Sequence, residues 1–190
     1  MAQRRFDIPD TGVLEARQKL VLDHVRDEIA HDWDATLSTF PHPRYELIAT
    51  MTVHDGDAEV RKYYHDTRVA FPDQRAELIE LRHSHDAVIA EFWLNGTHRG
   101  PLGKIPATGG AFRVRMTAIF QFDDNEHLIA ERIYFDSLTM LKQLLGALDF
   151  KRPASILTVV KALRGLLMLS GEPDPRLLET TEPPELRPAV

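Results

Sequence analysis

The residue in this chain best placed to do chemistry is Asp136. The segment 127–136 alternates in the two-residue pattern of a β-strand and ends at this carboxylate. Residues 137–146 then read as a short helix. A carboxylate between a strand end and a helix start can serve as a general acid or base in a pocket. The same position also suits a plain helix cap, which aspartate does well, and the two roles are compatible.

Strand alternation places Arg132, Tyr134 and Asp136 on one face and Ile129, Ile133 and Phe135 on the other. We expect the first face to line the pocket. Removal of a proton next to a carbonyl yields an enolate, which needs a nearby hydrogen-bond donor. The candidate donors are Tyr134, Arg132, His98 and Tyr64.

Three histidines have both a functional and a structural interpretation. His98 ends a predicted strand and could donate to a substrate oxygen, or its ring could bond a neighbouring carbonyl in the 100–110 connection. His24 and His31 lie seven residues apart on one helix face, where they could contact substrate or mark a half-exposed helix end. The structural interpretation is favoured for His24 and His31.

Apolar side chains on the predicted strands give a candidate pocket lining that includes Trp93, Met116 and Phe120. Phe92 and Trp93 fall on opposite faces, and alternation does not decide which faces the pocket. His83, His85 and Asp86 form a thin metal motif with no residue elsewhere to complete the shell, so we predict no metal and no cofactor.

The elements that must hold these residues follow from periodicity. Helices are predicted over 13–29, 32–40 and 57–71, and a strand or tight strand pair over 45–53. Four long strands follow at 75–83, 87–98, 111–122 and 127–136, the last two joined by a turn at 123–125. Helices followed by a run of strands indicate an α+β fold with a curved antiparallel sheet around a pocket.

The C-terminal part has a different composition. Residues 153–169 read as an amphipathic helix, and five prolines after Gly171 indicate an extended, mobile end. We therefore divide the chain into a domain at 1–149 and a helical, proline-rich extension at 150–190. The helix could cover the mouth of the pocket or a dimer interface. Its two positive charges are few for membrane binding.

Composition excludes several classes of protein. The 190 residues include no cysteine, which rules out disulfides, thiolate metal sites and a cysteine nucleophile. A net charge of −6 argues against nucleic-acid binding. No signal peptide or membrane-spanning run is visible, and we expect a cytoplasmic protein. Motifs of serine hydrolases, nucleotide-binding enzymes and zinc proteases are missing.

Several short segments, in order and spacing, resemble SnoaL-like proteins of the NTF2-like superfamily between about residues 13 and 147. They are Leu22–Asp32, Phe71–Asp73, Gly96–His98, Gly100-Pro101, Ile105-Pro106, Thr108-Gly109, Tyr134–Asp136 and Gln143–Gly146. The resemblance implies a cone-shaped α+β barrel, usually a homodimer, with an apolar pocket. Its best-known members are polyketide cyclases that perform an aldol condensation without metal or cofactor, using a late aspartate that Asp136 matches best.

The sequence thus predicts a cofactor-free enzyme that moves a proton on an apolar carbonyl compound, as an aldol cyclase or an isomerase. A non-catalytic protein that binds a small molecule in the same pocket is the main alternative, and an assembly module that uses the outer sheet face is another. Fold kinship alone does not decide among them.

Overall fold

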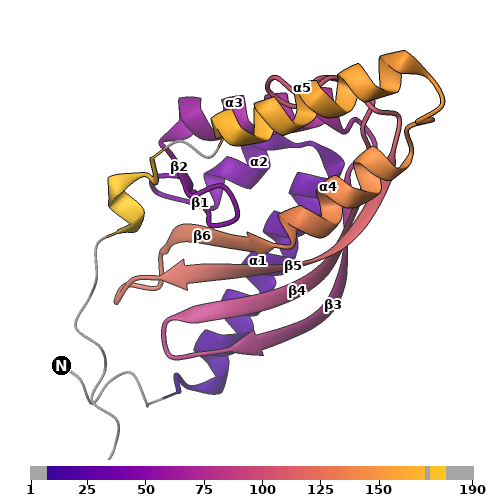
Figure 1. Cartoon of the computed structure of the whole chain (residues 1–190). Coiled ribbons are helices and arrows are strands. Elements are labelled where there is room, and N and C mark those ends of the chain that lie inside the picture. The colour runs from indigo at the N-terminus through magenta and orange to yellow at the C-terminus, as the bar shows by residue number, and fades with distance from the viewer. Residues whose placement is uncertain (1–7, 170–171, 179–190) are drawn as a thin grey trace, which may run out of the picture.

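The computed structural model describes residues 8–169 and 172–178 (Figure 1). In chain order, its elements are α1 (Thr11–Ala30), α2 (Trp33–Ser38), β1 (Arg44–Leu47), β2 (Thr52–Asp55), α3 (Asp57–Ala70), β3 (Arg75–His83), β4 (Ala87–Thr97), β5 (Ala111–Phe122), β6 (Leu128–Phe135), α4 (Ser137–Gly146), α5 (Pro153–Leu169) and the 3₁₀ helix η2 (Pro175–Leu177). No helix in the described part of the chain is both long and apolar enough to cross a bilayer.

The six strands form one curved sheet that does not close on itself, in the order β2-β1-β6-β5-β4-β3. The four long strands meander antiparallel, as predicted. The predicted strand pair is present as β1 and β2, and β1 joins the sheet by pairing parallel with β6. The α+β, cone-shaped fold predicted from sequence is confirmed.

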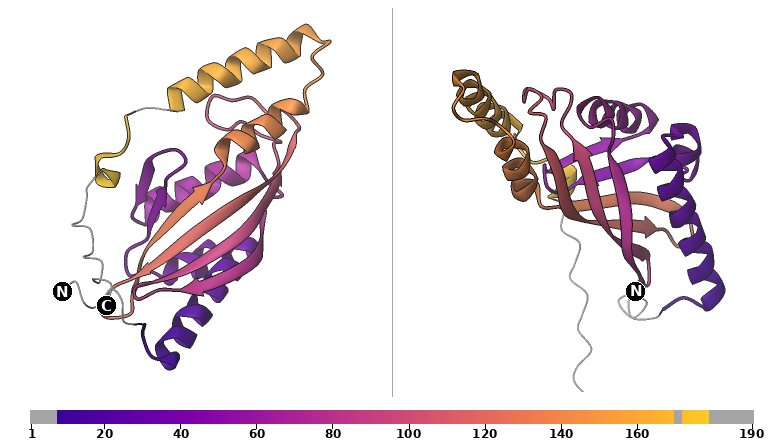
Figure 2. Two further views of the ribbon diagram at one scale, coloured as in Figure 1. Left: turned by 60° about the horizontal axis from the view of Figure 1, so that its bottom comes forward. Right: turned by 90° about the vertical axis from the view of Figure 1, so that its right-hand side faces the viewer.

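Helices α1, α3 and α4 pack against the concave face of this sheet, towards different ends of its strands. Figure 2 shows α1 at one end of the sheet and α4 and α5 at the other. Helix α1 contacts β3 and β4, α3 contacts β2, and α4 packs along β5. The main core lies between α1–α3 and the concave side of the sheet, and a second cluster joins α4 to the end of α3 and to β5.

Side-chain caps fix where the helices begin. Asp10 accepts from the amide of Val13 at the start of α1, and Asp32 accepts from that of Ala35 at the start of α2. Such caps satisfy backbone donors that the first turn leaves unpaired. Helix α1 ends at His31, which adopts the left-handed conformation with φ 62°. The backbone changes direction at this residue, just before α2 begins.

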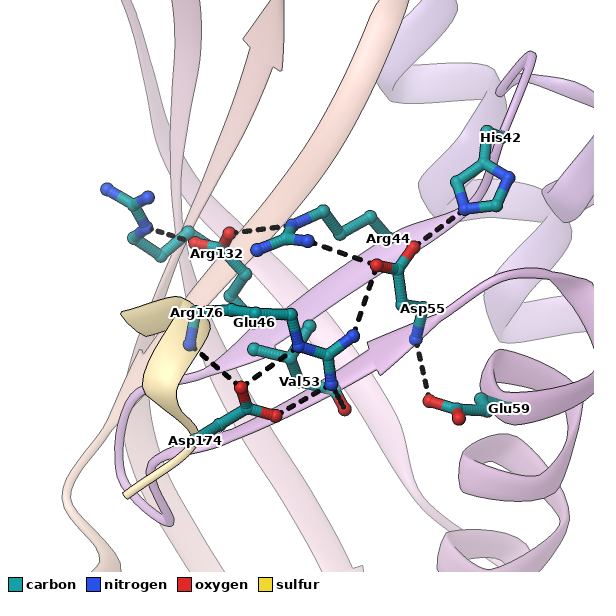
Figure 3. Close-up of polar contacts among 9 residues, drawn as sticks. All are labelled: His42, Arg44, Glu46, Val53, Asp55, Glu59, Arg132, Asp174 and Arg176. Carbon is teal, nitrogen blue, oxygen red and sulfur yellow. Dashed lines mark hydrogen bonds and ion pairs between the residues drawn. The ribbon is translucent and has the colours of Figure 1, made fainter. Parts of the chain in front are cut away.

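The C-terminal segment agrees with the predictions only in part. The predicted helix over 153–169 is present as α5. Residues 172–178, however, include the short helix η2 and dock on β2, so they do not continue as an extended chain. Arg176 pairs with Asp55 at 3.1 Å and donates to the carbonyl of Val53 (Figure 3). Residues 171 and 179–190, to which the prediction of a mobile end also applied, lie outside the described residues.

Candidate active site

A cavity of about 240 Å³ lies between the concave face of the sheet and helices α1, α3 and α4. Its lining is mostly aliphatic and aromatic, and its charged groups are few. The apolar lining residues are Val25, Ile29, Leu47, Phe71, Ala76, Phe92, Leu94, Leu102, Ile105, Met116, Phe120, Ile133, Phe135, Met140, Leu141 and Leu144. The charged ones are Glu28, Arg68, Arg75 and Glu131. An apolar cavity with a few convergent polar groups is the usual form of a small-molecule site.

Strand β6 contributes a carboxylate to this cavity. Glu131 is 2% exposed, and its Oε2 has no hydrogen-bond partner among the described residues. Parallel pairing with β1 sets Glu131 opposite Tyr45, and Ile133 opposite Leu47, so these four side chains share the inner face. A buried carboxylate oxygen without a donor costs free energy, so this position is a candidate functional residue.

Helix α1 brings a second carboxylate to the same place. His24 and Glu28 lie one turn apart, so their side chains leave the same helix face. The polar atoms of His24, Glu28 and Glu131 all lie within 4.8 Å of one another. Burial, and then repulsion from Glu131, raise the pKa of the Glu28 carboxyl to about 7. Glu28 is therefore protonated for much of the time near neutral pH.

A chain of hydrogen bonds fixes the imidazole of His24. Thr39 donates its hydroxyl proton to the carbonyl of Thr36, so it must accept from Nδ1–H of His24 at 2.9 Å. In the neutral ring Nε2 is then the acceptor, and the Tyr45 hydroxyl donates to it at 2.9 Å. Tyr45 in turn accepts a short hydrogen bond from Tyr64. Glu131 Oε2 lies 3.4 Å from Nε2 and receives no proton from it in this arrangement.

Helix α3 supplies further donors. Burial raises the pKa of both Tyr63 and Tyr64, so both phenols keep their protons. Tyr63 lines the cavity, whereas Tyr64 is fully buried behind it. One turn beyond Tyr64, Arg68 reaches the cavity and lies 3.7 Å from Glu28. The site thus combines two carboxyl groups, a phenol and a guanidinium within an apolar enclosure.

The same three residues could also hold a cation. Among the described residues, His24, Glu28 and Glu131 form the one group with three potential ligand atoms close together. One imidazole and two carboxylates suit a divalent ion. An ion would first have to displace the Tyr45 hydroxyl from His24 Nε2. The predicted motif of His83, His85 and Asp86 forms no such group.

Comparison with known proteins agrees with this architecture. The model of the SnoaL-like polyketide cyclase family matches residues 19–144, which is more than half of the chain. The chain belongs to the SnoaL-like polyketide cyclase family. No functionally curated protein matches it.

Solved structures share the fold at low sequence identity. A putative SnoaL-like polyketide cyclase from Jannaschia sp. CCS1 is 20% identical, with a TM-score of 0.61 over 67% of this chain and 90% of its own. TsrD from Streptomyces laurentii is 25% identical, with a TM-score of 0.59 over 74% and 99% of the two chains. IdmH, a putative polyketide cyclase from Streptomyces antibioticus, is 20% identical, with a TM-score of 0.57 over 67% and 97%.

The prediction of which β6 face lines the pocket was wrong. Glu131, Ile133 and Phe135 line the cavity, while Arg132 and Tyr134 lie on the outer face. Arg132 donates to Glu46 at 2.6 Å in an ion-pair network that continues through Arg44 to Asp55 (Figure 3). Tyr134 is 42% exposed. Neither side chain is placed to orient a molecule in the cavity.

Asp136 follows the last residue of β6 and caps α4. One oxygen accepts from the amide of Thr139 at 2.9 Å, and the other accepts from the Thr139 hydroxyl at 2.6 Å. These hydrogen bonds, first the one from the hydroxyl, lower the pKa of Asp136. The side chain is exposed and is not among the cavity residues, although Phe135 and Ser137 are. Its position matches the capping role weighed above and gives no support to an acid/base role.

The other predicted site residues are divided between the cavity and the rest of the molecule. Met116 and Phe120 line the cavity, with Phe92 in place of Trp93. Trp93 lies on the outer face, where the guanidinium of Arg113 sits 4.5 Å from its ring centroid.

Two histidines lie away from the cavity lining. His98 is buried near the 100–110 loop, and its Nδ1 lies 3.2 Å from the Thr108 hydroxyl, in the loop that its structural interpretation named. His31 is exposed, stacks on Trp33 and accepts from Arg68 Nε at 3.0 Å. By contrast His24, which was read as part of a half-exposed helix end, is completely buried at the centre of the polar cluster.

Sequence reasoning missed Glu28, Glu131, Tyr45, Tyr63 and Arg68. Two signals were available for the carboxylates. Glu28 follows His24 by four residues, which places both on one helix face. Glu131 alternates with Ile133 and Phe135, so it is an acidic residue on an otherwise apolar strand face. An ionisable residue on an apolar face is a candidate functional group.

Proposed function

We propose that this protein is an enzyme that moves a proton on an apolar carbonyl compound, as an aldol cyclase or a double-bond isomerase, and that Glu131 is its base. The observation that carries the proposal is the buried Glu131 in the lining of an apolar cavity, next to Glu28, with an Oε2 that has no hydrogen-bond partner in the described part of the chain. Family membership supports cyclase or isomerase chemistry in general.

In the proposed reaction, Glu131 takes a proton from the carbon next to the substrate carbonyl. The electron pair of the broken C–H bond moves to the carbonyl oxygen and forms an enolate. Protonated Glu28 or the Tyr63 phenol donates a hydrogen bond to that oxygen. The enolate can attack a second carbonyl carbon of the same molecule, whose C=O electron pair moves to its oxygen, and that oxygen then takes the proton from Glu131. Alternatively, the enolate takes the proton back from Glu131 at another carbon. Both outcomes need only these side chains and a dry enclosure.

The raised pKa of Glu28 suits this task. Burial, and then the nearby charge of Glu131, raise this pKa to about 7, so Glu28 retains a proton up to about that pH. While it is protonated, Glu28 can donate a hydrogen bond to the oxygen on which negative charge forms.

Deuterium exchange tests the proposal without the natural substrate. The protein is added to 1-tetralone, and to a small panel of other bicyclic ketones, in buffered D₂O near neutral pD. Proton NMR follows the loss of signal at the carbon next to the carbonyl. We expect the wild type to exceed the buffer rate, Glu131→Gln to fall back to it, and Asp136→Asn to keep the wild-type rate.

Other results would favour other functions. Full exchange in Glu131→Gln, or its loss only in Asp136→Asn, would overturn the assignment of the base. Binding of the ketones without exchange in the wild type would favour a non-catalytic binding protein. Activity that disappears on dialysis against EDTA and returns with a divalent ion would instead assign His24, Glu28 and Glu131 as metal ligands.

A further inference from the structure

Arg68 is a cation at the cavity that the proposed reaction does not use. It lies in the last turn of α3, and its guanidinium carbon is 5.4 Å from the ring centroid of Trp33. Nε donates to His31 Nε2 at 3.0 Å, which holds the side chain at one end. The Arg68 side chain is 12% exposed. It is therefore fixed in place and largely shielded from water.

The outer nitrogens of this guanidinium are poorly satisfied. Nη1 is buried and has no hydrogen-bond partner among the described residues, and Nη2 has only Glu28 at 3.7 Å, beyond hydrogen-bond distance. Nη1 and Nη2 form one edge of the planar group, the edge that binds a carboxylate through two parallel hydrogen bonds. Arg68 is itself a cavity-lining residue, and its Nη1 lies buried in the wall of the enclosure.

The positive charge of Arg68 is also only partly balanced by nearby acidic groups. Its nearest acidic group is Glu28, which carries a proton for much of the time near neutral pH. The other acidic group of the cavity, Glu131, is assigned to the base. An arginine is always charged, and a buried cation without a counter-charge is costly. An anionic group of the ligand would supply both the missing charge and the missing acceptors.

We propose that the ligand of this cavity is an apolar molecule of about two fused rings that carries a carboxylate, and that the Nη1–Nη2 edge of Arg68 binds this carboxylate. The proposal rests on the function proposed above and names its substrate class. A volume of about 240 Å³ lies just below the range of roughly 300–1,000 Å³ for pockets that hold drug-sized ligands, which favours a small molecule. Arg68 would then position the carbon skeleton for Glu131 and touch no reacting atom.

Calorimetric titration at pH 6 with 2-naphthoate and 2-naphthamide tests this assignment. The two probes share their ring system and differ in charge. We expect the wild type to bind the naphthoate at least tenfold more tightly than the amide. Arg68→Gln should lose this preference and keep the affinity for the amide within about threefold. Arg68→Lys keeps the charge but lacks the planar fork, so it should retain part of the preference.

Two matched variants control the experiment. Arg75→Gln removes the other arginine of the cavity, whose Nε contacts the exposed Glu77 at 3.5 Å, and should keep the preference. Glu131→Gln should also keep it, so that a failure of the proposed catalysis is separated from a failure of anion binding. Equal affinity of the wild type for both probes, binding of neither, or an unchanged preference in folded Arg68→Gln would overturn the proposal.

Discussion

The raised pKa of Glu28 predicts that the protein loses stability between pH 4.5 and 7. An unperturbed glutamate releases its proton near pH 4.5, whereas Glu28 in the folded protein holds it to about pH 7. The folded state therefore binds one proton more than the unfolded state in this window. The contribution of Glu28 to stability is full below pH 4.5, falls as the pH rises to 7, and falls no further above that.

The size of the loss follows from the same two values. Each pH unit in the window costs up to about 1.4 kcal/mol, which gives at most roughly 3 kcal/mol over the interval from 4.5 to 7. Because 26% of the Glu28 side chain is exposed, this figure is an upper bound.

Urea unfolding of the wild type and of Glu28→Gln, measured from pH 4.5 to 8, isolates this contribution. Other groups titrate over the same range, but they do so in both proteins and cancel in the difference. The free energy of unfolding of the wild type, minus that of the variant, should decrease by about 2–3 kcal/mol from pH 4.5 to 7.5. Glu15→Gln, on the exposed face of the same helix, should give a flat difference.

A flat difference for Glu28→Gln, or one that increases with pH, would refute the reasoning. The same comparison, made in a protein that also carries Glu131→Gln, separates the two causes of the raised pKa of Glu28. Removing the charge of Glu131 should narrow the pH window without closing it, because burial is the larger cause of the raised pKa.

Three further predictions concern positions outside the carboxyl pair. Asp136→Ala should lower the urea midpoint by removing the α4 cap, and Asp136→Asn should restore most of it; equal midpoints in both would contradict capping. Tyr45→Phe leaves His24 Nε2 without its donor and should cost about 1–3 kcal/mol in urea unfolding, whereas a cost below about 0.5 kcal/mol would contradict the hydrogen-bond chain. Arg176→Ala should speed protease cleavage within residues 172–178 with almost no change in midpoint, and unchanged cleavage would argue against docking through this residue.

The architecture could be predicted because it rests on local patterns. Period-two alternation marks the four long strands, and the predicted turn at 123–125 is present, with one carboxylate oxygen of Asp123 accepting the amides of Asn125 and His127. Asp10 caps α1 just before its apolar repeat. Each of these signals needs only neighbours in the sequence.

The site could not be predicted in the same way because it depends on contacts distant in sequence. Alternation divides β6 into two faces but does not state which is inward. That choice follows from the parallel pairing with β1, which sets Tyr45 beside Glu131 and Glu46 beside Arg132 across 86 residues. Because the pairing buries Tyr45 and Leu47, it turns Glu131 toward the cavity and Arg132 away from it. Asp136 lies just beyond this strand, and its side chain caps α4.

The central claim is that the carboxyl pair in the cavity, and not Asp136, faces the reacting part of the ligand. A crystal structure of the protein soaked with 2-naphthol, a neutral and planar mimic of an enol, tests it most directly. We predict that the rings lie against Phe92, Met116 and Ile133, with the hydroxyl oxygen within about 3 Å of a carboxyl oxygen of Glu131 or Glu28. An empty cavity, or a naphthol bound with its hydroxyl at Asp136, would contradict the account.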